Sequence, residues 1–238
     1  MEKLITVFEK NDMTRLLAFG SSNTQLGQHA DGCFNWFNWL DVGLGNHVGR
    51  KLITINSGIS GDTCAQLLER YERDCAFFKP DIVIVTIGGN DSNPERGITP
   101  EKFRELLEEL ISRLKENKNC RVMLQTYYSF DIEKLPESEK GWGNNFPVYM
   151  EIVRQTAKKS DCLLIDHLVR WEKLRKADVV LYRKLMRDTK HLTPLGNMVM
   201  GLDTLRAFGA WLTGELPAQC KEGTKIQKLM DKLEGTFF

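Results

Sequence analysis

The sequence lacks the long apolar segments that characterise membrane and secreted proteins. Its longest largely apolar run, residues 82–87, has the length of a strand, whereas a membrane-spanning helix needs about 18 such residues. Near the start, only about five apolar residues precede Glu9 and Lys10, whereas the core of a secretory signal needs roughly 7–15. We therefore expect a cytoplasmic protein without a membrane span.

Paired cysteines and clusters of like charge are also missing. The six cysteines are scattered without any C-x-x-C pair, so we expect reduced, mostly buried thiols and no metal site. The 33 basic and 32 acidic residues are interleaved and leave a net charge of +1. Because no basic stripe is available to neutralise phosphates, nucleic acid is not an expected partner.

The length and composition are those of one globular domain. Of the 238 residues, 42% are hydrophobic, and no repeat, low-complexity tract or Pro/Ser-rich linker divides them. We predict a single domain over residues 1–238, with a core from about 14 to 216 and a C-terminal tail from 217 to 238. The sequence leaves a homo-oligomer open.

Short β-rich runs alternate with longer helical patterns along this domain. The run DIVIVTI (81–87) is typical of a central parallel strand that is buried on both faces. About five alternations predict a three-layer α/β/α sandwich on a mostly parallel five-stranded sheet. No organic cofactor is implied. Strands are expected at 15–19, 51–56, 81–87, 121–126 and 162–166, and helices at 63–75, 100–117, 147–159, 168–177 and 194–212.

Polar and small residues stand where the strands end. Ser22 follows the first expected strand, Gly61 the second and Asn90 the third, while Asp188 and His191 precede the last helix. Since loops after parallel strands meet at one edge of a sheet, we expect these residues to converge. A serine hydroxyl becomes nucleophilic when histidine removes its proton, and a carboxylate on the other ring nitrogen fixes the tautomer. The backbone N–H groups of Ser22 and Gly61 and the Asn90 amide are candidate oxyanion donors.

These blocks resemble the SGNH hydrolases, the GDSL-like esterase and lipase family. The matching segments are FGSS (19–22), 56–63, GGND (88–91) and DTKH (188–191), in the family's order. The resemblance covers about residues 17–201 and implies a flavodoxin-like sandwich. It assigns Ser22 as nucleophile, Asp188 and His191 as the acid–base pair, and Ser22, Gly61 and Asn90 as the oxyanion hole.

One position departs from the family pattern. The family usually carries Asp immediately before its serine, where it helps to hold the nucleophile loop, and this chain has Ser21 there. Ser21 is therefore a rival nucleophile, although the spacing from Gly20 favours Ser22.

Several aromatic and histidine residues admit two interpretations. Aromatic residues after the first and fourth expected strands could line a sugar or acyl pocket, although ordinary burial is the more common role. Histidines outside the matching blocks are expected to be structural or solvated, and His167 is the one that merits inspection. The aromatic residues are Trp36, Trp39, Trp142, Tyr127 and Tyr128, and the other histidines are His29 and His47.

The predicted function is hydrolysis of a carboxylic ester through an acyl-enzyme. Short acyl or O-acetyl groups on a carbohydrate or small molecule are the favoured substrates, because HLTPLG (191–196) resembles the same block of carbohydrate acetylesterases. A lysophospholipase or lipase is an alternative. A non-catalytic, flavodoxin-like ligand-binding protein is another, since GSSNT (20–24) resembles a phosphate loop.

Overall fold

Five parallel strands form where the sequence carries its short apolar runs. The computed structural model describes residues 6–25, 32–212 and 218–235. The strand order is β2-β1-β3-β4-β5, which is the flavodoxin-like order, and the predicted fold class is confirmed. All five expected strands are present: β1 (Thr14–Gly20), β2 (Leu52–Gly58), β3 (Ile82–Thr86), β4 (Arg121–Gln125) and β5 (Leu163–Ile165).

The central strands bury both of their faces. Along β1, Leu16 and Ala18 belong to one hydrophobic core, while Leu17 and Phe19 belong to a second core on the other side of the sheet. The same alternation runs along β3, all five residues of which are buried. A strand between two apolar layers cannot alternate with polar residues, which explains the continuous run at 82–87.

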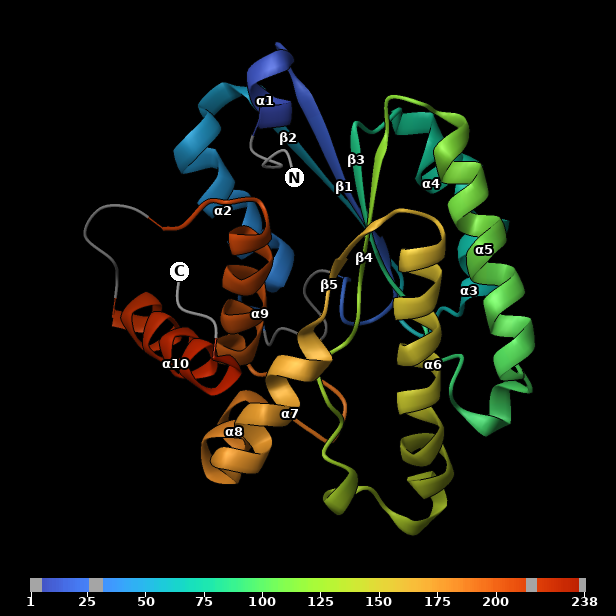
Figure 1. Cartoon of the computed structure of the whole chain (residues 1–238), viewed down its shortest axis with the longest axis vertical. Coiled ribbons are helices and arrows are strands. Elements are labelled where there is room, and N and C mark those ends of the chain that lie inside the picture. Colours follow the sequence, from blue (N-terminus) through green and yellow to red (C-terminus); the bar gives the residue numbers. More distant parts are fainter. Residues whose placement is uncertain (1–5, 26–31, 213–217, 236–238) are drawn as a thin grey trace.

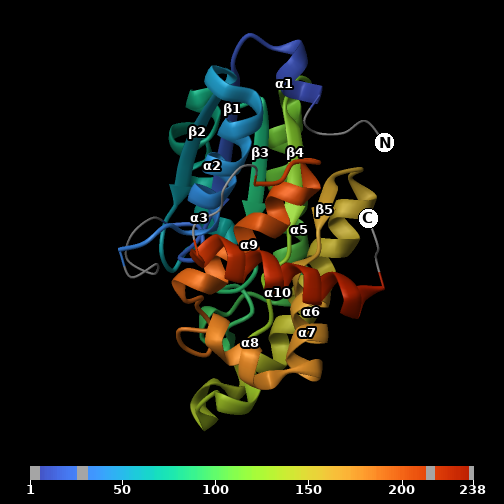
Figure 2. The ribbon, with the colours of Figure 1, turned by 90° about the vertical axis from the view of Figure 1, so that its left-hand side faces the viewer.

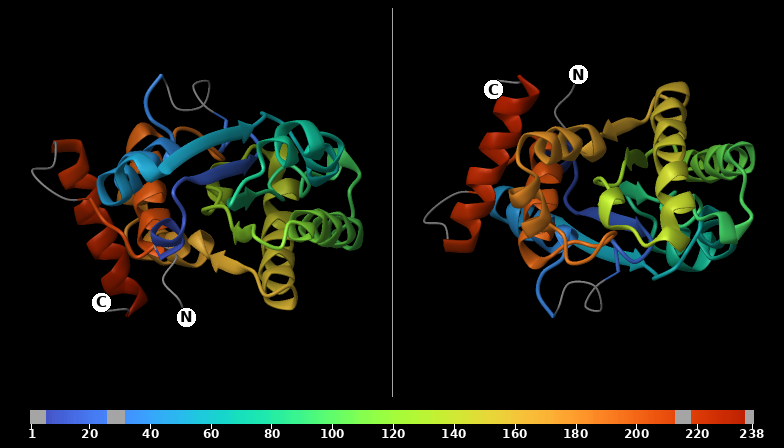
Figure 3. Two further views of the ribbon diagram at one scale, coloured as in Figure 1. Left: turned by 90° about the horizontal axis from the view of Figure 1, so that it is seen from above. Right: turned by 90° about the horizontal axis from the view of Figure 1, so that it is seen from below.

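Helices cover the two faces as separate layers (Figures 1 and 3). One layer packs on the first core and the other on the second, so the sheet is enclosed on both sides. The first layer contains α1 (Thr6–Lys10), α2 (Trp36–Val48), α7 (His167–Ala177), α8 (Val179–Leu185), α9 (Pro194–Ala207) and α10 (Ala218–Glu234). The second contains α3 (Cys64–Glu69), α4 (Tyr71–Asp74), α5 (Pro100–Glu116) and α6 (Lys140–Lys159).

Several helices differ from the sequence-based prediction: the helix expected at 194–212 ends at Ala207, and α1 and α8 have no predicted counterpart. The helix expected at 63–75 divides at Arg70, whose buried guanidinium bonds Asp62 and the carbonyl oxygen of Gly20. Helix α6 begins at Lys140 rather than at Pro147, because Phe146 and its neighbours pack into the core ahead of the proline. Helix α2 was not predicted; its glycines and asparagines obscured the apolar face.

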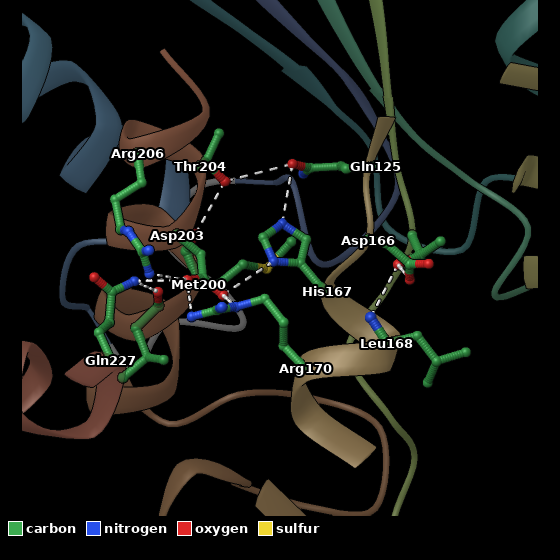
Figure 4. A network of polar contacts seen from close by, with 12 residues as sticks. Gln125, Asp166, His167, Leu168, Arg170, Met200, Asp203, Thr204, Arg206 and Gln227 are labelled. Atoms are coloured by element: carbon green, nitrogen blue, oxygen red, sulfur yellow. Dashed lines mark hydrogen bonds and ion pairs between the residues drawn. The ribbon is translucent and has the colours of Figure 1, made fainter. Parts of the chain in front are cut away.

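The segment predicted to be a C-terminal tail contains helix α10. This helix lies across α9 on the outer side of the molecule (Figure 2) and buries Cys220, Ile226 and Met230. Arg170 of α7 bonds Asp203 of α9 (Figure 4). It also bonds Asp231 of α10, so one guanidinium joins three helices. Apolar burial and this charged network together attach the helix to the sandwich.

The strand order predicts that ligands bind at one edge of the sheet. In the order 2-1-3-4-5, the connections after β1 and β3 leave in opposite directions, and ligands bind at that switch point. The predicted site residues at positions 22 and 90 lie in the loops after these two strands. Across the residues described, no helix has both the length and the apolarity needed to cross a bilayer.

Candidate active site

Ser22 lies in a tight turn immediately after β1. The backbone N–H groups of Thr24 and Gln25 both donate to the carbonyl oxygen of Ser21 at 2.9 Å, which closes the turn around Ser22. Ser22 is only 8% exposed, and its Oγ lies 3.2 Å from Nε2 of His191. The structure thus brings together the first and last predicted blocks.

The other ring nitrogen of His191 faces Asp188. Nδ1 lies 2.9 Å from Oδ2 and 3.1 Å from Oδ1 of the carboxylate. A carboxylate accepts but does not donate, so the proton of the neutral ring resides on Nδ1 and leaves the lone pair of Nε2 facing the Ser22 hydroxyl. This is the tautomer that a general base for Ser22 requires.

Asp188 is held in its ionised form by the turn it closes. Burial alone would raise the pKa of the carboxyl, but the hydrogen bond from His191 and the backbone N–H groups of Lys190 and His191 outweigh it and lower the pKa well below its usual range. Those N–H groups donate to Oδ1 at 2.7 and 2.8 Å. The negative charge beside the imidazole is therefore present at neutral pH.

The histidine loop is fixed between a β-bridge and helix α9. Arg187 N–H donates to the carbonyl of His191 at 2.8 Å, beside the antiparallel bridge between Met186 and Leu192. Thr193 then caps α9. Gly196 is the third residue of that helix. A Cβ at this position would lie 2.2 Å from the carbonyl oxygen of Leu185, so only glycine fits there.

The loops that carry two of the oxyanion candidates, Gly61 and Asn90, are connected to each other. Nδ2 of Asn90 donates to the carbonyl of Asp62 at 2.8 Å, next to Gly61. Gly61 has a φ of +85°, which glycine adopts without strain. Arg70 secures the same loop by bonding Asp62 at 2.7 Å and the Gly20 carbonyl, at the end of β1, at 3.0 Å. Sequence reasoning did not identify this arginine, since no motif marks it.

A small cavity of about 40 Å³ opens beside the Ser22–His191 pair. Asn90 borders the cavity, whereas Gly61 is not among its lining residues and belongs to the adjoining loop. The lining combines the predicted polar groups with three aromatic rings and consists of Ser21, Ser22, Asn23, Gly89, Asn90, Tyr127, Phe130, Trp142, Lys190 and His191.

Comparison with known proteins identifies the family. The chain matches the GDSL-like Lipase/Acylhydrolase family over residues 18–199. It belongs to this family. It is thus an SGNH-type serine ester hydrolase, as the four sequence blocks predicted.

Individual relatives of this acylhydrolase agree with the family assignment. An acetylxylan esterase from Geobacillus stearothermophilus is 26% identical over 164 residues, which cover 65% of this chain and 71% of that protein. The crystal structure of LAE5, an alpha/beta hydrolase enzyme from the metagenome of Lake Arreo, Spain, is 25% identical, with a TM-score of 0.69 over 84% of this chain and 97% of LAE5. A catalytic mutant of the G. stearothermophilus acetylxylan esterase Axe2 shares the fold at 23% identity, with a TM-score of 0.69 and coverage of 85% and 97%.

Ser21, the departure from the family pattern, has its own partner in this acylhydrolase. Its Oγ lies 2.7 Å from the hydroxyl of Tyr127, and both residues are almost completely buried. The hydroxyl that faces His191 belongs to Ser22. This geometry favours Ser22 over Ser21 as the nucleophile.

The predicted aromatic residues divide into cavity wall and core. Trp142 borders the cavity, where its indole Nε1 donates to the Gly89 carbonyl at 2.6 Å and the Lys190 ammonium lies 4.1 Å from its ring centre. Tyr127 also borders it, whereas Trp36 is fully buried in the first core and Trp39 packs against that core.

Phe130 and Lys190 were not identified as site residues from the sequence. Both lie within the loops already singled out, Phe130 three residues beyond Tyr127 and Lys190 inside the Asp-x-x-His block. Their positions in those loops were the sequence signal that could have identified them as site residues.

The remaining histidines lie outside the cavity lining or outside the described residues. His47 is hydrogen-bonded to Trp211, and His167 is fully buried, with Nε2 3.3 Å from Gln125 and Nδ1 3.6 Å from Asp203. His29 belongs to the residues that the structure does not describe. Within 6–25, 32–212 and 218–235, no three His, Cys, Asp or Glu side chains are grouped so that they could hold a metal ion.

Proposed function

We propose that Ser22 attacks an ester carbonyl and forms an acyl-enzyme, with His191 as base and Asp188 as its orienting carboxylate. The observation that carries the proposal is the continuous path from Asp188 through Nδ1 and Nε2 of His191 to Ser22 Oγ, at 2.9 and 3.2 Å. His191 takes the serine proton as the new C–O bond forms, then donates it to the leaving alcohol. Water, activated by the same ring, releases the acid and restores Ser22.

The tetrahedral intermediate needs donors at its oxyanion. We assign this role to the backbone N–H groups of Ser22 and Gly61 and to the side-chain amide of Asn90. Asn90 borders the cavity and uses one amide hydrogen on Asp62, so a second hydrogen is available for the substrate. Each such donor contributes roughly 3–4 kcal/mol to transition-state stabilisation in other hydrolases.

The size of the cavity supports a short acyl group. Its volume of about 40 Å³ is a few times the ~10–15 Å³ that one water molecule requires on the same measure, which suits an acetyl group better than a fatty chain. The aromatic walls could stack on a sugar ring, and the acetylxylan esterase relative acts on an acetylated carbohydrate. We therefore propose O-acetyl or other short-acyl esters of a carbohydrate or small molecule as substrates, rather than lysophospholipids.

Two observations weigh against a non-catalytic ligand-binding protein. Such a protein has no use for a histidine whose two ring nitrogens contact Asp188 and Ser22. Crystal structures of the related Axe2 also include catalytic mutants in which a serine or an aspartate is replaced by alanine. That relative uses the same two residue types in catalysis.

Ser22→Ala tests the proposal directly. We expect hydrolysis of p-nitrophenyl acetate to fall at least ~10⁴-fold and fluorophosphonate labelling to disappear, because both need the activated hydroxyl. The matched control is Ser57→Ala, whose hydroxyl donates to the Asp74 carbonyl outside the cavity lining, and it should keep parental turnover. Retained labelling of a folded Ser22→Ala protein would move the nucleophile elsewhere, with Ser21 as the first candidate.

The substrate class needs a separate measurement. Specific activity on acetylated xylo-oligosaccharides should exceed that on p-nitrophenyl esters with acyl chains of eight or more carbons. A preference for the long-chain esters or for lysophospholipids would overturn the short-acyl assignment while leaving the mechanism intact.

A further inference from the structure

The residues on both sides of Ser22 are hydrogen-bonded to two consecutive tyrosines. Ser21 Oγ lies 2.7 Å from the Tyr127 hydroxyl, and Tyr128 donates to Oδ1 of Asn23 at 2.6 Å. Both tyrosines follow strand β4 and are at most 2% exposed. The turn that carries the nucleophile is therefore attached to β4 as well as to its own strand, β1.

The two rings are anchored in different cores. Tyr127 belongs to the core under α5 and α6, where its ring centre lies 6.2 Å from that of Phe146. Tyr128 belongs to the core on the other side of the sheet, with its ring centre 5.2 Å from that of Trp171. Consecutive residues of an extended chain point to opposite faces, so each hydroxyl reaches the turn from its own side of the sheet.

Tyr128 also contacts the loop that carries the base. Its hydroxyl donates to the backbone carbonyl of Lys190 at 2.7 Å, and Lys190 immediately precedes His191. One buried proton is thus shared between an acceptor next to Ser22 and an acceptor next to His191.

Burial keeps both phenols in the form that can donate. It raises the pKa of Tyr127 and of Tyr128 above the ordinary tyrosine value, and the hydrogen-bond contacts with Ser21 and Asn23 only partly offset this rise. The two hydroxyls therefore stay protonated over the whole range in which an esterase operates. Their contacts with the turn do not depend on pH in that range.

We propose that Tyr127 and Tyr128 are positioning residues that hold Ser22 and His191 at reacting distance, replacing the acidic residue that the family usually carries at position 21. Tyr127 fixes the turn through Ser21, and Tyr128 fixes the turn and the histidine loop relative to each other. Displacement of a catalytic group by about 1 Å can lower a rate about 100-fold, so this alignment has a measurable consequence. The inference rests on the proposed roles of Ser22 and His191.

Tyr128→Phe is the decisive variant, because it removes the shared hydroxyl and retains the ring that packs on Trp171. We expect the rate constant for fluorophosphonate labelling of Ser22 and the kcat for p-nitrophenyl acetate to fall about 10- to 100-fold, with KM changed less than about threefold. The final labelled fraction should remain complete. A variant that was merely partly unfolded would instead lose labelled fraction while the folded molecules reacted at the parental rate.

The matched control is Tyr71→Phe. Tyr71 also donates a buried phenol proton to a backbone carbonyl, that of Arg113 at 3.0 Å, but it lies outside the cavity lining. Its removal should leave the labelling rate constant unchanged. A parental rate constant in Tyr128→Phe, or an equal slowing in Tyr71→Phe, would overturn the inference. Persistent labelling of Ser22→Ala would instead refute the proposed function, so the two failures are distinguishable.

The contact between Ser21 and Tyr127 is tested by a double-mutant cycle. Ser21→Ala and Tyr127→Phe remove opposite ends of one hydrogen bond, so the double variant should label no more slowly than the slower single variant. Independent, multiplicative losses would show that the two hydroxyls act separately and would contradict the role given to Tyr127.

Discussion

Asp91 is a buried carboxylic acid immediately after Asn90. Its side chain is fully buried, and Oδ1 accepts the backbone N–H of Cys64 at 2.8 Å, at the start of helix α3. Burial raises the pKa of Asp91 to about 6, and the hydrogen bonds from Cys64 and neighbouring backbone groups lower it only in part. The folded protein therefore holds this proton more tightly than the unfolded chain does.

Asp91→Asn removes the titrating carboxyl and so measures how much the ionisation of Asp91 lowers the free energy of unfolding. Because the folded pKa lies above the unfolded value of 3.8, the stabilisation from Asp91 is complete below pH 3.8 and is lost as the pH rises through about 6. The parental free energy of unfolding should fall by up to roughly 3 kcal/mol relative to the asparagine variant over that range. Urea denaturation at a series of pH values from 3.5 to 8 measures the difference.

Asp166→Asn provides a control of opposite sign. Burial would raise the pKa of Asp166, but its paired hydrogen bonds with Arg154, at 2.6 and 3.0 Å, outweigh this and lower it. The stabilisation from Asp166 is therefore present above the unfolded pKa and is lost as the pH falls. If both variants showed the same trend with pH, the assignment for Asp91 would be wrong.

Helix α6 is the element that closes the cavity. Its first turns carry Trp142, and Phe146 of the next turn stacks on Phe130 with a ring-centre separation of 3.9 Å. Lys190 links this wall to the histidine loop through the ring of Trp142 and an ion pair with Glu139 at 2.6 Å. The helix therefore borders the space in which we propose that the acyl group binds.

Trp142→Ala should relax the preference for short acyl chains. Removing the indole enlarges the cavity, so the ratio of kcat/KM for p-nitrophenyl butyrate to that for the acetate should rise about 10-fold. Val148→Ala, at a 49% exposed position of the same helix, is the control and should leave the ratio unchanged. An equal loss on both esters would place Trp142 away from the acyl chain.

At the scale of elements, the sequence predicted those strands and helices that local residue patterns determine. Residues 82–87 predicted a buried central strand because no polar residue interrupts them until Thr86. The start of α6 could not be predicted, because it depends on Phe146 meeting Phe130 and not on the helix propensity of a segment that contains Pro147. Helix α2 was not predicted either, because its buried residues pack with those of α9 in one core, and such a contact between distant segments is not visible in a local pattern.

The candidate site followed the same division between local pattern and tertiary contact. The residue types, their places after the strands and the family resemblance together predicted Ser22, Asn90, Asp188 and His191. The phenol pair, Arg70 and Lys190 depend on distances between loops, which one sequence does not contain. Cytoplasmic location and oligomeric state stay predictions.

On the scale of the whole molecule, a charged network attaches helix α10 to the sandwich. Asp203 is 6% exposed and receives hydrogen bonds from Arg170 at 3.0 Å and from Gln227 of α10 at 2.8 Å (Figure 4). Burial would raise the pKa of Asp203, but the contact with His167 and the charge of Arg170 outweigh it and lower the pKa. These contacts therefore keep the carboxylate ionised despite its burial.

Arg170→Met should lower the free energy of unfolding by about 3 kcal/mol, since it leaves a buried carboxylate without its main partner. Arg175→Met, on the same helix but paired with the more exposed Glu172 and Glu133, should cost less than about 1 kcal/mol. Urea denaturation measures both. Equal losses would show that the buried network contributes no more than the exposed ion pairs of Arg175. Slower labelling of Ser22 in Arg170→Met would show that loss of the network also affects the active site.

The hydroxyl at position 22 and the imidazole that faces it are 169 residues apart in the chain. A fragment that ends before position 191 or begins after position 22 lacks one of the two groups, so a folding intermediate in which the histidine loop has not reached the first strand cannot turn over substrate by the proposed mechanism. Ester cleavage is consequently an assay of long-range assembly: during refolding, it should appear only when the segment around position 191 has docked beside the first strand.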